Sequence, residues 1–325
     1  MATATDTTAM RKHKRENNSF EKIVAISFSH KLKENHSTMQ SAIQQKRYPS
    51  ISIITVVLNN KKGFRLTAES VISQTAFDKL EWIVIDAAST DGTVDTIKEF
   101  DSKIAYWKSE PDKGIYDGMN KGIAQATGKY MLFLNAGDTL CNYKVIESVI
   151  NDNNFGKADH LTGNQYLVAD GKIVSTDLAK EELTTASLFL YALPHQSTFI
   201  RGNRLKETGG YDISYKICAD AKFTFMDIVM KGGTYRKLDH FISNYDASGI
   251  STTNPATSKK ERERFLKELL PPMIYEDYRR TTSAKSIERI ITRINSNSIT
   301  YKIIRLFCFI CYAPIHLKNK IRTLL

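Results

Sequence analysis

The sequence predicts an α/β fold, in which a mostly parallel sheet carries helices on both faces in a Rossmann-like, nucleotide-binding arrangement. Three observations support this prediction. Short apolar runs occur at 51–58, 80–85 and 130–134, and the first is rich in β-branched residues. Segments with apolar residues at helical spacing separate the runs, and the carboxylates Asp86 and Asp138 follow two of them. Alternating strands and helices of this kind form parallel sheets that bind ligands at the carboxyl edge.

The first βαβ unit begins with the run at 51–58, whose composition is that of a strand buried on both faces. Polar residues then interrupt the run, and a helix is expected at 66–74. The second strand, 80–85, ends at Asp86. Because such crossovers are right-handed, the two strands are expected to be parallel neighbours.

A loop of small polar residues, 87–93, leads to the next helix. Asp91 or Thr93 can cap that helix, and for Asp91 capping is the stronger interpretation. A third strand is expected at 104–107. This completes the alternating pattern up to the next loop.

The stretch from 109 to 140 contains the third helix and the fourth strand of the pattern. Apolar residues recur at helical spacing between Ile115 and Ile123, and Gly128 stops the helix. The strand at 130–134 is followed by Asn-Ala-Gly-Asp, which brings Asp138 to the carboxyl edge of the sheet. Asp138 is therefore a candidate site residue.

After residue 140 the pattern changes from parallel to mixed structure. Two short runs, 163–168 and 172–175, flank Asp170-Gly171 and predict an antiparallel hairpin. Further on, a helix is expected to open near Asp220 and to continue through Met230. The chain thus predicts a nucleotide-binding half followed by a mixed half.

Length and composition predict one large domain with two appendages. The chain has 325 residues, 42% of them hydrophobic, and can bury a sizeable core. The expected boundaries are an arm at 1–48, disordered or loosely packed, a domain at 49–257 divided near 140, and a helical basic tail at 258–325. No apolar segment follows the basic RKHKR cluster, which argues against a signal peptide.

The net charge of +11 indicates an anionic partner, which could be a nucleotide, an anionic lipid surface or nucleic acid. No nucleic-acid motif accompanies the charge, and much of it lies in the two appendages, so a membrane surface is the simpler interpretation. The apolar run at 305–318 is shorter than the roughly 20 residues that a spanning helix needs. It fits an interfacial helix equally as well as a helix that packs on the domain or on a second subunit.

The four cysteines do not predict a disulfide framework. Cys141 and Cys218 stand alone, which fits a reducing compartment. Cys308 and Cys311 form a C-x-x-C inside an apolar run without a second ligand pair, so buried thiols are favoured over a zinc or redox site. A dinucleotide-dependent oxidoreductase is disfavoured because NNKKGF, not G-x-G-x-x-G, follows the first strand.

Four segments in order, ISIITVVLNN, WIVIDAASTDGT, EPDKGIYDGMNKGIAQATGKY and LFLNAGD, resemble the family 2 glycosyltransferases with the GT-A fold. The resemblance is to the branch that builds bacterial capsule, exopolysaccharide and lipopolysaccharide O-antigen units, and it covers about residues 50–250. It implies transfer of a sugar from a nucleoside diphosphate donor to an acceptor hydroxyl, with inversion at the anomeric carbon.

The resemblance implies that Thr55, Val57 and Asn59, with Asp86, contact the base and ribose of the donor. A carboxylate suits Asp86 because it accepts hydrogen bonds from ribose hydroxyls, although a cap or loop role is the alternative. Lys113 lies in a loop whose family counterpart approaches the donor, where a cation could balance the diphosphate.

The NAGD segment stands where the family has its metal-binding DxD. Asn135 and Gly137 occupy the two carboxylate positions, so Asn135 is assigned to donor binding and Asp138 to the metal. Mg²⁺ or Mn²⁺ held by one carboxylate, phosphate oxygens and waters is chemically sensible. The strength of the metal dependence stays open, and a helix cap is the alternative role for Asp138.

By the same resemblance, Asp220 is the catalytic base, with Asp212 as the second choice and a helix N-terminal carboxylate as the alternative role of Asp220. His195 and Gln196 resemble the family's HQ pair near the acceptor and the donor phosphates. A site role for His195 is favoured over a structural one, because Pro-His-Gln-Ser between strands is a poor core environment.

The sequence therefore predicts an inverting, hexosyltransferase-type glycosyltransferase of bacterial surface polysaccharide synthesis. Its expected partners are a nucleotide sugar, a glycan or lipid-linked acceptor, and an anionic membrane surface bound through the tail. The expected location is the cytoplasmic face of the cell membrane, a homodimer is possible, and no nucleic acid is expected. The alternative is a catalytically weak nucleotide-sugar binding or scaffold protein, which the degenerate DxD motivates and the retention of Asp138 and Asp220 disfavours.

Overall fold

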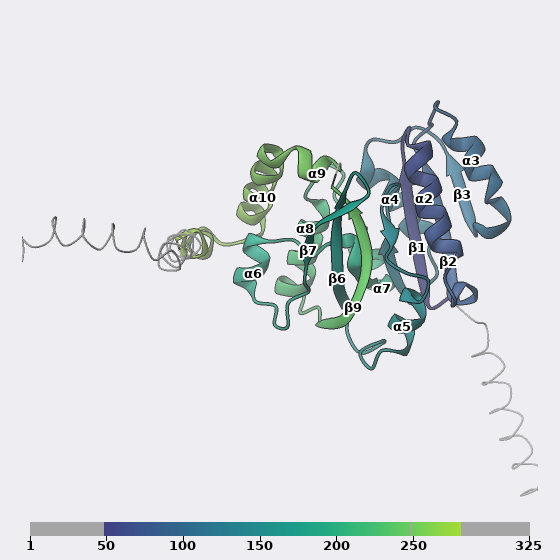
Figure 1. Ribbon diagram of the computed structural model, residues 1–325. Coiled ribbons are helices and arrows are strands. Elements are labelled where there is room, and N and C mark those ends of the chain that lie inside the picture. The colour runs from purple at the N-terminus through teal and green to yellow at the C-terminus, as the bar shows by residue number, and fades with distance from the viewer. Residues whose placement is uncertain (1–48, 248, 281–325) are drawn as a thin grey trace, which may run out of the picture. The chain divides into compact units, whose positions relative to one another are not determined.

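The computed structural model describes residues 49–247 and 249–280 (Figure 1). The predicted arm at 1–48, the apolar run at 305–318 and the C-x-x-C pair lie outside the described residues. None of the helices within the described part is both long and apolar enough to cross a membrane.

The first half of the sheet is parallel, as the alternating pattern predicts. In three of its four strands the side chains are largely buried, which explains the continuous apolar runs. The register pairs Ile54 with Ile83 of one neighbour and with Phe133 of the other. The four strands lie in the order β3 (Tyr106–Ser109), β2 (Leu80–Asp86), β1 (Ile51–Val57) and β4 (Tyr130–Phe133).

The second half of the sheet is mixed, which confirms the predicted change of pattern. From β4 outward the order is β8 (Thr198–Arg201), β6 (His160–Ala169), β9 (Tyr235–Asp246) and β5 (Thr139–Leu140). Only the β6–β9 pair is parallel among these. The predicted hairpin is present, because β7 (Lys172–Asp177) pairs antiparallel with β6.

Helices cover both faces of the sheet. One face packs on α2 (Lys61–Ile72), α3 (Thr93–Glu99) and α5 (Val145–Asn151). The other face packs on α4 (Ile115–Gln125), α6 (Thr185–Leu190), α7 (Gly202–Glu207), α8 (Ala219–Phe225) and α10 (Pro255–Leu269). The remaining short helices are η1 (Phe77–Lys79), η2 (Asp101–Lys103), η3 (His195–Ser197), the π-helix η4 (Met226–Met230) and α9 (Ile250–Thr253).

Two boundaries differ from the sequence prediction for local reasons. Helix α2 begins at Lys61 because the side chain of Asn60 accepts a hydrogen bond from the Gly63 N–H. The third strand begins at Tyr106, after the turn of η2. The N-cap residue of α3 is Gly92, and not Asp91 or Thr93 as predicted, and Asp91 accepts hydrogen bonds from the Thr93 N–H and hydroxyl from one position earlier.

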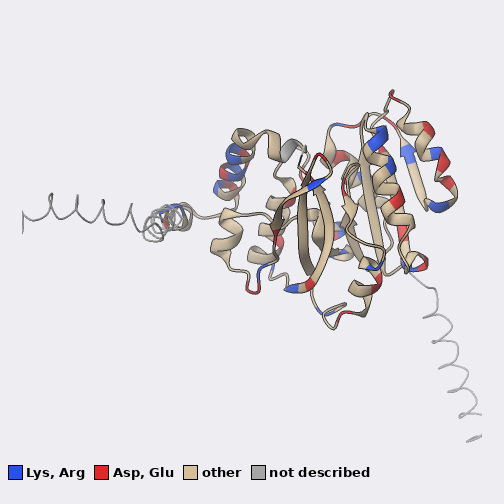
Figure 2. Ribbon diagram, in the orientation of Figure 1, with Lys and Arg blue, Asp and Glu red and all other residues tan. Residues whose placement is uncertain are grey.

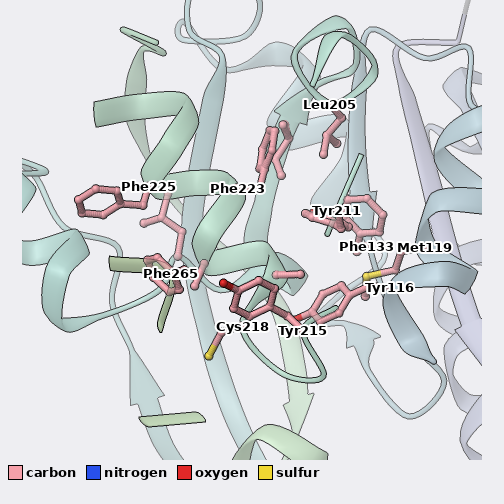
Figure 3. Close-up of a cluster of buried hydrophobic side chains, with 14 of the residues drawn as sticks. Tyr116, Met119, Phe133, Leu205, Tyr211, Tyr215, Cys218, Phe223, Phe225 and Phe265 are labelled. Atoms are coloured by element: carbon pink, nitrogen blue, oxygen red, sulfur yellow. The ribbon is translucent and has the colours of Figure 1, made fainter. Parts of the chain in front are cut away.

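The core on the α4 face joins the two halves of the sheet (Figure 3). The Tyr211 ring lies 5.5 Å from that of Tyr116 and 5.2 Å from that of Phe133, measured between centroids. Phe225 of α8 packs on Phe265 of α10 with a centroid distance of 6.2 Å. The expected boundary at residue 257 therefore falls inside α10, and that helix contributes to this core.

Gly128 provides a stability prediction. Its N–H donates to the hydroxyl of Ser52, 2.8 Å away, and a Cβ atom at this position would lie 2.5 Å from the backbone nitrogen of Ser52. Because β1 is buried, its backbone has little room to move, and Gly128→Ala is expected to destabilise the protein by about 1 to 3 kcal/mol. Urea unfolding measures this change, with Ser102→Ala on the surface as the control. An unfolding midpoint equal to that of the control variant would contradict the packing described here.

Candidate active site

A cavity of about 460 Å³ opens at the carboxyl end of β1 and β4. Its wall combines the segments that follow these strands, the start of α4, the short helix η3 and the end of β9. The strand order β3-β2-β1-β4 reverses between β1 and β4, and α/β sheets bind ligands at such switch points. We therefore take this cavity as the candidate active site.

His195, Asp220 and Tyr116 form a chain of hydrogen bonds beside the cavity. The Nδ1 atom of His195 lies 2.9 Å from Oδ2 of Asp220. The hydroxyl of Tyr116 donates to Oδ1 of Asp220 at 2.9 Å and is also 2.6 Å from the carbonyl oxygen of Ile217. The Ala221 N–H is a further donor to Oδ1 of Asp220. Both oxygens of Asp220 are thus occupied by groups of the protein.

The two charged partners shift each other's pKa. Burial alone raises the pKa of Asp220, but the hydrogen bond and charge of His195 and the hydrogen bond from Tyr116 lower it below 3.8 overall. Burial alone lowers the pKa of His195, but hydrogen bonding to Asp220 and the negative charges of Asp220 and Asp138 raise it above 6.5 overall. Asp220 is therefore ionised at neutral pH, and the imidazole is more basic than an exposed one.

Asn135 extends this chain on the other side of the imidazole. Its Nδ2 atom lies 3.2 Å from Nε2 of His195. The Oδ1 atom of Asn135 is buried and has no hydrogen-bond partner within the part of the chain that the structure describes. Asn135 is one of the residues that line the cavity.

Asp138 lies at the cavity with 4% of its surface exposed. Burial raises the pKa of its carboxyl group to about 7, although the charge of His195 and a hydrogen bond from the Asp246 N–H act in the opposite direction. The carboxylate of Asp246 is close enough to oppose ionisation further. No cluster of three or more His, Cys, Asp or Glu side chains arranged for a metal occurs in residues 49–247 and 249–280.

The predicted site residues fall into two groups. Five of them line the cavity. Asp220 does not line it, but it is hydrogen-bonded to one of the five, His195. These five come from three separate segments of the chain, which the sheet order brings together. They are Val57, Asn135, Asp138, His195 and Gln196.

Four predicted donor contacts, Thr55, Asn59, Lys113 and Asp86, do not line the cavity. Thr55 is buried farther from the carboxyl end of β1, where its hydroxyl accepts a hydrogen bond from Nε1 of Trp82. Asn59 is exposed and holds the neighbouring loop through the Thr90 N–H. Lys113 is exposed as well, and its backbone N–H donates to Asp117. The side chains of Thr55, Asn59 and Lys113 are therefore not part of the cavity wall.

Asp86 is fully buried next to the cavity wall. Its Oδ2 atom accepts hydrogen bonds from the Ser89 N–H and the Ser109 hydroxyl, at 2.9 and 2.6 Å. Its Oδ1 atom has no partner among the described residues. The neighbouring Ala87 lines the cavity, so Asp86 supports the loop there without facing the open space itself.

Asp212, the second choice for a base, is paired elsewhere. Its carboxylate accepts a hydrogen bond from Nζ of Lys222 at 2.9 Å, and it is absent from the cavity wall described above. Although burial alone would raise it, the pKa of Asp212 is lowered to about 2 by hydrogen bonds from Lys222 and Ser214. A carboxylate this acidic is a poor proton acceptor.

Sequence reasoning missed two residues of the site. Tyr116, which bonds Asp220, lies inside the GIYDGMNK segment, where its helical position indicated only a core residue. Asp246 lines the cavity beside Asp138 and ends strand β9. A carboxylate at the end of a strand was the available signal, because the same pattern had singled out Asp86 and Asp138.

Comparison with known proteins finds the model of the family described as "Glycosyl transferase family 2" at residues 52–206. An uncharacterized glycosyltransferase of Mycobacterium tuberculosis is 32% identical over 180 residues, which are 54% of this chain and 67% of the relative. An Escherichia coli protein named as a UDP-Glc:α-D-GlcNAc-diphosphoundecaprenol β-1,3-glucosyltransferase is 29% identical over 187 residues, 56% of this chain and 71% of the relative.

Solved structures share the fold. TarS of Staphylococcus aureus, residues 1–349 with UDP, superposes with a TM-score of 0.55 at 18% identity, over 77% of this chain and 73% of that one. The match to the longer TarS structure covers 42% of it. A mannosyltransferase of Pyrobaculum calidifontis, in complex with GDP-Man and Mn²⁺, gives a TM-score of 0.52 at 13% identity over 85% of this chain and 84% of that one.

Proposed function

This chain belongs to the family 2 glycosyltransferases, and on that premise we propose that it is an inverting enzyme which transfers a hexose from a nucleoside diphosphate to a hydroxyl group. The acceptor is a glycan or a lipid-linked glycan of bacterial surface polysaccharide synthesis. One observation carries the proposal. Asn135, Asp138 and His195, with Asp220 behind them, meet at a single cavity at the carboxyl edge of the sheet.

The donor diphosphate occupies the part of the cavity next to Asp138. The buried carboxylate there accepts one backbone hydrogen bond and lies beside a second carboxylate, so a divalent cation would offset the cost of burying its charge. An oxygen ligand suits Mg²⁺ or Mn²⁺, with phosphate oxygens and waters completing the shell. Such a cation, when bound, would stabilise the negative charge of the departing diphosphate.

The protein's own residues then have distinct tasks. Val57 and Asn135 line the cavity and contact the donor, and Gln196 lies next to the His195–Asp220 pair. That pair supplies the general base which takes the proton from the attacking hydroxyl. Displacement from the face opposite the diphosphate inverts the anomeric carbon.

The proposed acceptor is supported by a relative of the chain, and the proposed location is supported by the basic charge of its last part. The printed name of the Escherichia coli relative specifies a diphosphoundecaprenol-linked acceptor, so we propose a lipid-linked acceptor here too. In Figure 2 the ribbon of α10 is marked by basic residues, and the helix has five lysines and arginines against three glutamates. With the basic tail that follows, this supports binding to the anionic inner face of the cell membrane. Self-association as a homodimer is part of the same proposal.

Calorimetric titration tests the donor site. UDP, GDP, ADP and dTDP are titrated into the full chain with and without Mn²⁺, and the matching nucleotide sugars are then tested for transfer to a lipid-linked acceptor. We expect one diphosphate to bind, more weakly without Mn²⁺, and its sugar to be transferred with inversion. Binding of none of the four would contradict the proposal. Selective binding without transfer or hydrolysis would favour the scaffold alternative, which the single carboxylate of NAGD motivates.

A further inference from the structure

The wall of the cavity carries a lysine that the sequence analysis did not single out. Among the described residues that line the cavity, Lys216 is the only lysine or arginine, whereas three aspartates, Asp112, Asp138 and Asp246, lie on the same wall. Lys222 of the same segment takes part in two ion pairs. Within the described part of the chain, Lys216 takes part in none. Its exposed ammonium group is therefore open to an anion in the cavity.

Helix α10 holds the backbone of this lysine in place. One carboxylate oxygen of Glu261 accepts a hydrogen bond from the Lys216 N–H at 2.7 Å. The other oxygen accepts from the N–H groups of Ile217 and Cys218, at 2.8 and 2.9 Å. Hydrogen bonds to an ionised carboxylate are among the stronger ones in proteins, and three of them fix this segment at the cavity wall. Cys218 is also the N-cap of α8, the helix that carries Asp220.

A chain of hydrogen bonds joins this segment to the pair that supplies the general base. The hydroxyl of Tyr116 lies 2.6 Å from the carbonyl oxygen of Ile217 and 2.9 Å from Oδ1 of Asp220. His195 is bonded to the other oxygen of Asp220. Ile217 follows Lys216 directly, so the lysine lies at the Tyr116 end of this chain.

The proposed site of the donor diphosphate lies at the opposite end. There His195 is 3.2 Å from Nδ2 of Asn135, and Asp138 belongs to the same loop after β4. In a displacement with inversion, the acceptor approaches the anomeric carbon from the face opposite the leaving diphosphate, with its hydroxyl at the base. The base therefore separates the donor side of the cavity from the acceptor side, and Lys216 lies on the acceptor side.

We infer that Lys216 binds a phosphate group that joins the acceptor sugar to its lipid, and that Glu261 is a positioning residue which holds the lysine at the cavity. The inference rests on the proposed function and names a chemical feature of the acceptor within it. An ammonium group and a phosphate oxygen form a charge-assisted hydrogen bond. Glu261 lies on α10, the basic helix assigned above to the membrane surface, so a lipid carrier reaches the site from this side.

Calorimetric titration of farnesyl diphosphate, a short lipid diphosphate, into the full chain tests the inference without sugar transfer. Mn²⁺ and the preferred nucleoside diphosphate are present at saturation, which keeps the probe away from Asp138. Lys216→Met should weaken binding of the probe about 10-fold, and Lys216→Arg should keep most of the affinity. Binding should also weaken with added salt. Lys172→Met, on the exposed strand β7, is the matched control.

Glu261→Gln separates positioning of the lysine from general stability. The amide has one acceptor oxygen, and its NH₂ group would face a backbone donor, so the three hydrogen bonds cannot all remain. The substitution should weaken binding of the probe in the unaltered background. In the Lys216→Met background it should add no further loss, because the group through which it acts is absent. Glu263→Gln, exposed on the same helix, is the control, and urea unfolding checks that each variant is folded.

Kinetics with the acceptor that the unaltered enzyme uses tests the role in transfer. Lys216→Met should raise the KM of the acceptor about 10-fold, while kcat and the Kd of the nucleoside diphosphate change little. A lysine that bound the donor would instead change the affinity for the nucleoside diphosphate.

Several outcomes would overturn the inference. Farnesyl diphosphate that fails to bind the unaltered protein, or binds Lys216→Met equally well, would remove the phosphate site. Weaker binding of the nucleoside diphosphate alone would assign the lysine to the donor. A further loss of probe affinity when Glu261→Gln is added to Lys216→Met would show that Glu261 does not act through the lysine. Absence of nucleotide binding and transfer would contradict the proposed function, and the titration repeated without nucleotide would still decide the role of Lys216.

Discussion

Replacement of Asp138 by asparagine is expected to lower sugar transfer by about 10²- to 10³-fold, which corresponds to roughly 3 to 4 kcal/mol of transition-state stabilisation. The amide keeps the shape of the side chain but lacks the charge that would hold a divalent cation at the donor diphosphate. Removal of the metal with EDTA should lower the activity of the unaltered enzyme and change that of Asp138→Asn little. Initial rates with and without added Mn²⁺ measure both effects.

The same variant should fold normally, which separates a site role from a structural one. Asp138 is 4% exposed, and its charge is buried with one backbone donor. Removal of a poorly compensated buried charge costs no stability, so the melting temperature of Asp138→Asn should equal or exceed that of the unaltered protein. Asp239→Asn, at an exposed ion pair on β9, is the control for both measurements. Unchanged transfer in Asp138→Asn would remove the metal from the proposed mechanism.

Asp227→Asn is expected to cost about 3 to 5 kcal/mol of unfolding free energy at neutral pH, because it removes one partner of a buried ionic network. The carboxylate is fully buried and lies 2.8 Å from Nε2 of His160 and 2.6 Å from Nη2 of Arg204. This network joins β6 to α7 and η4 on the α4 face of the sheet, away from the cavity. Urea unfolding measures the loss, and Asp95→Asn at an exposed pair with Lys98 is the control.

The pH dependence of this loss has a defined sign. Burial alone raises the pKa of Asp227, but the hydrogen bonds and charges of His160 and Arg204 lower it below 3.8 overall. A carboxyl group whose pKa is lower in the folded state contributes stability above its unfolded pKa and loses it below. The difference between the unaltered protein and Asp227→Asn should therefore shrink as the pH falls below 3.8. A difference that stays constant as the pH falls well below 3.8 would show that Asp227 acts through packing alone.

The sheet could be predicted from the sequence because three of its first four strands are largely buried on both faces. A strand of that kind must be apolar along its whole length, and the runs in β1, β2 and β4 are therefore visible without any structure. The third strand was misplaced by two residues, since its side chains are only half-buried and the signal is weaker. The hairpin of β6 and β7 was predicted correctly from its Asp-Gly turn.

The orientation of individual side chains was harder to predict. Thr55 and Val57 share one face of β1, yet Thr55 bonds Trp82 in the core and Val57 lines the cavity. The difference is their position along the strand, because only its carboxyl end reaches the site. Similarity of motifs alone does not show, to within two residues, how close a side chain lies to the carboxyl end of the strand.

The sequence by itself determined the fold class, the family and the edge of the sheet that holds the site, because these depend on local runs and on motifs of adjacent residues. The tertiary structure decided which site residues meet. His195 and Asp220 are 25 residues apart, and Tyr116 bonds Asp220 across 104 residues. Their contacts exist because β8 inserts antiparallel beside β4 and brings the helices after it against α4. Which distant residues come into contact depends on the order of strands in the sheet. The spacing of residues along the chain does not encode that order.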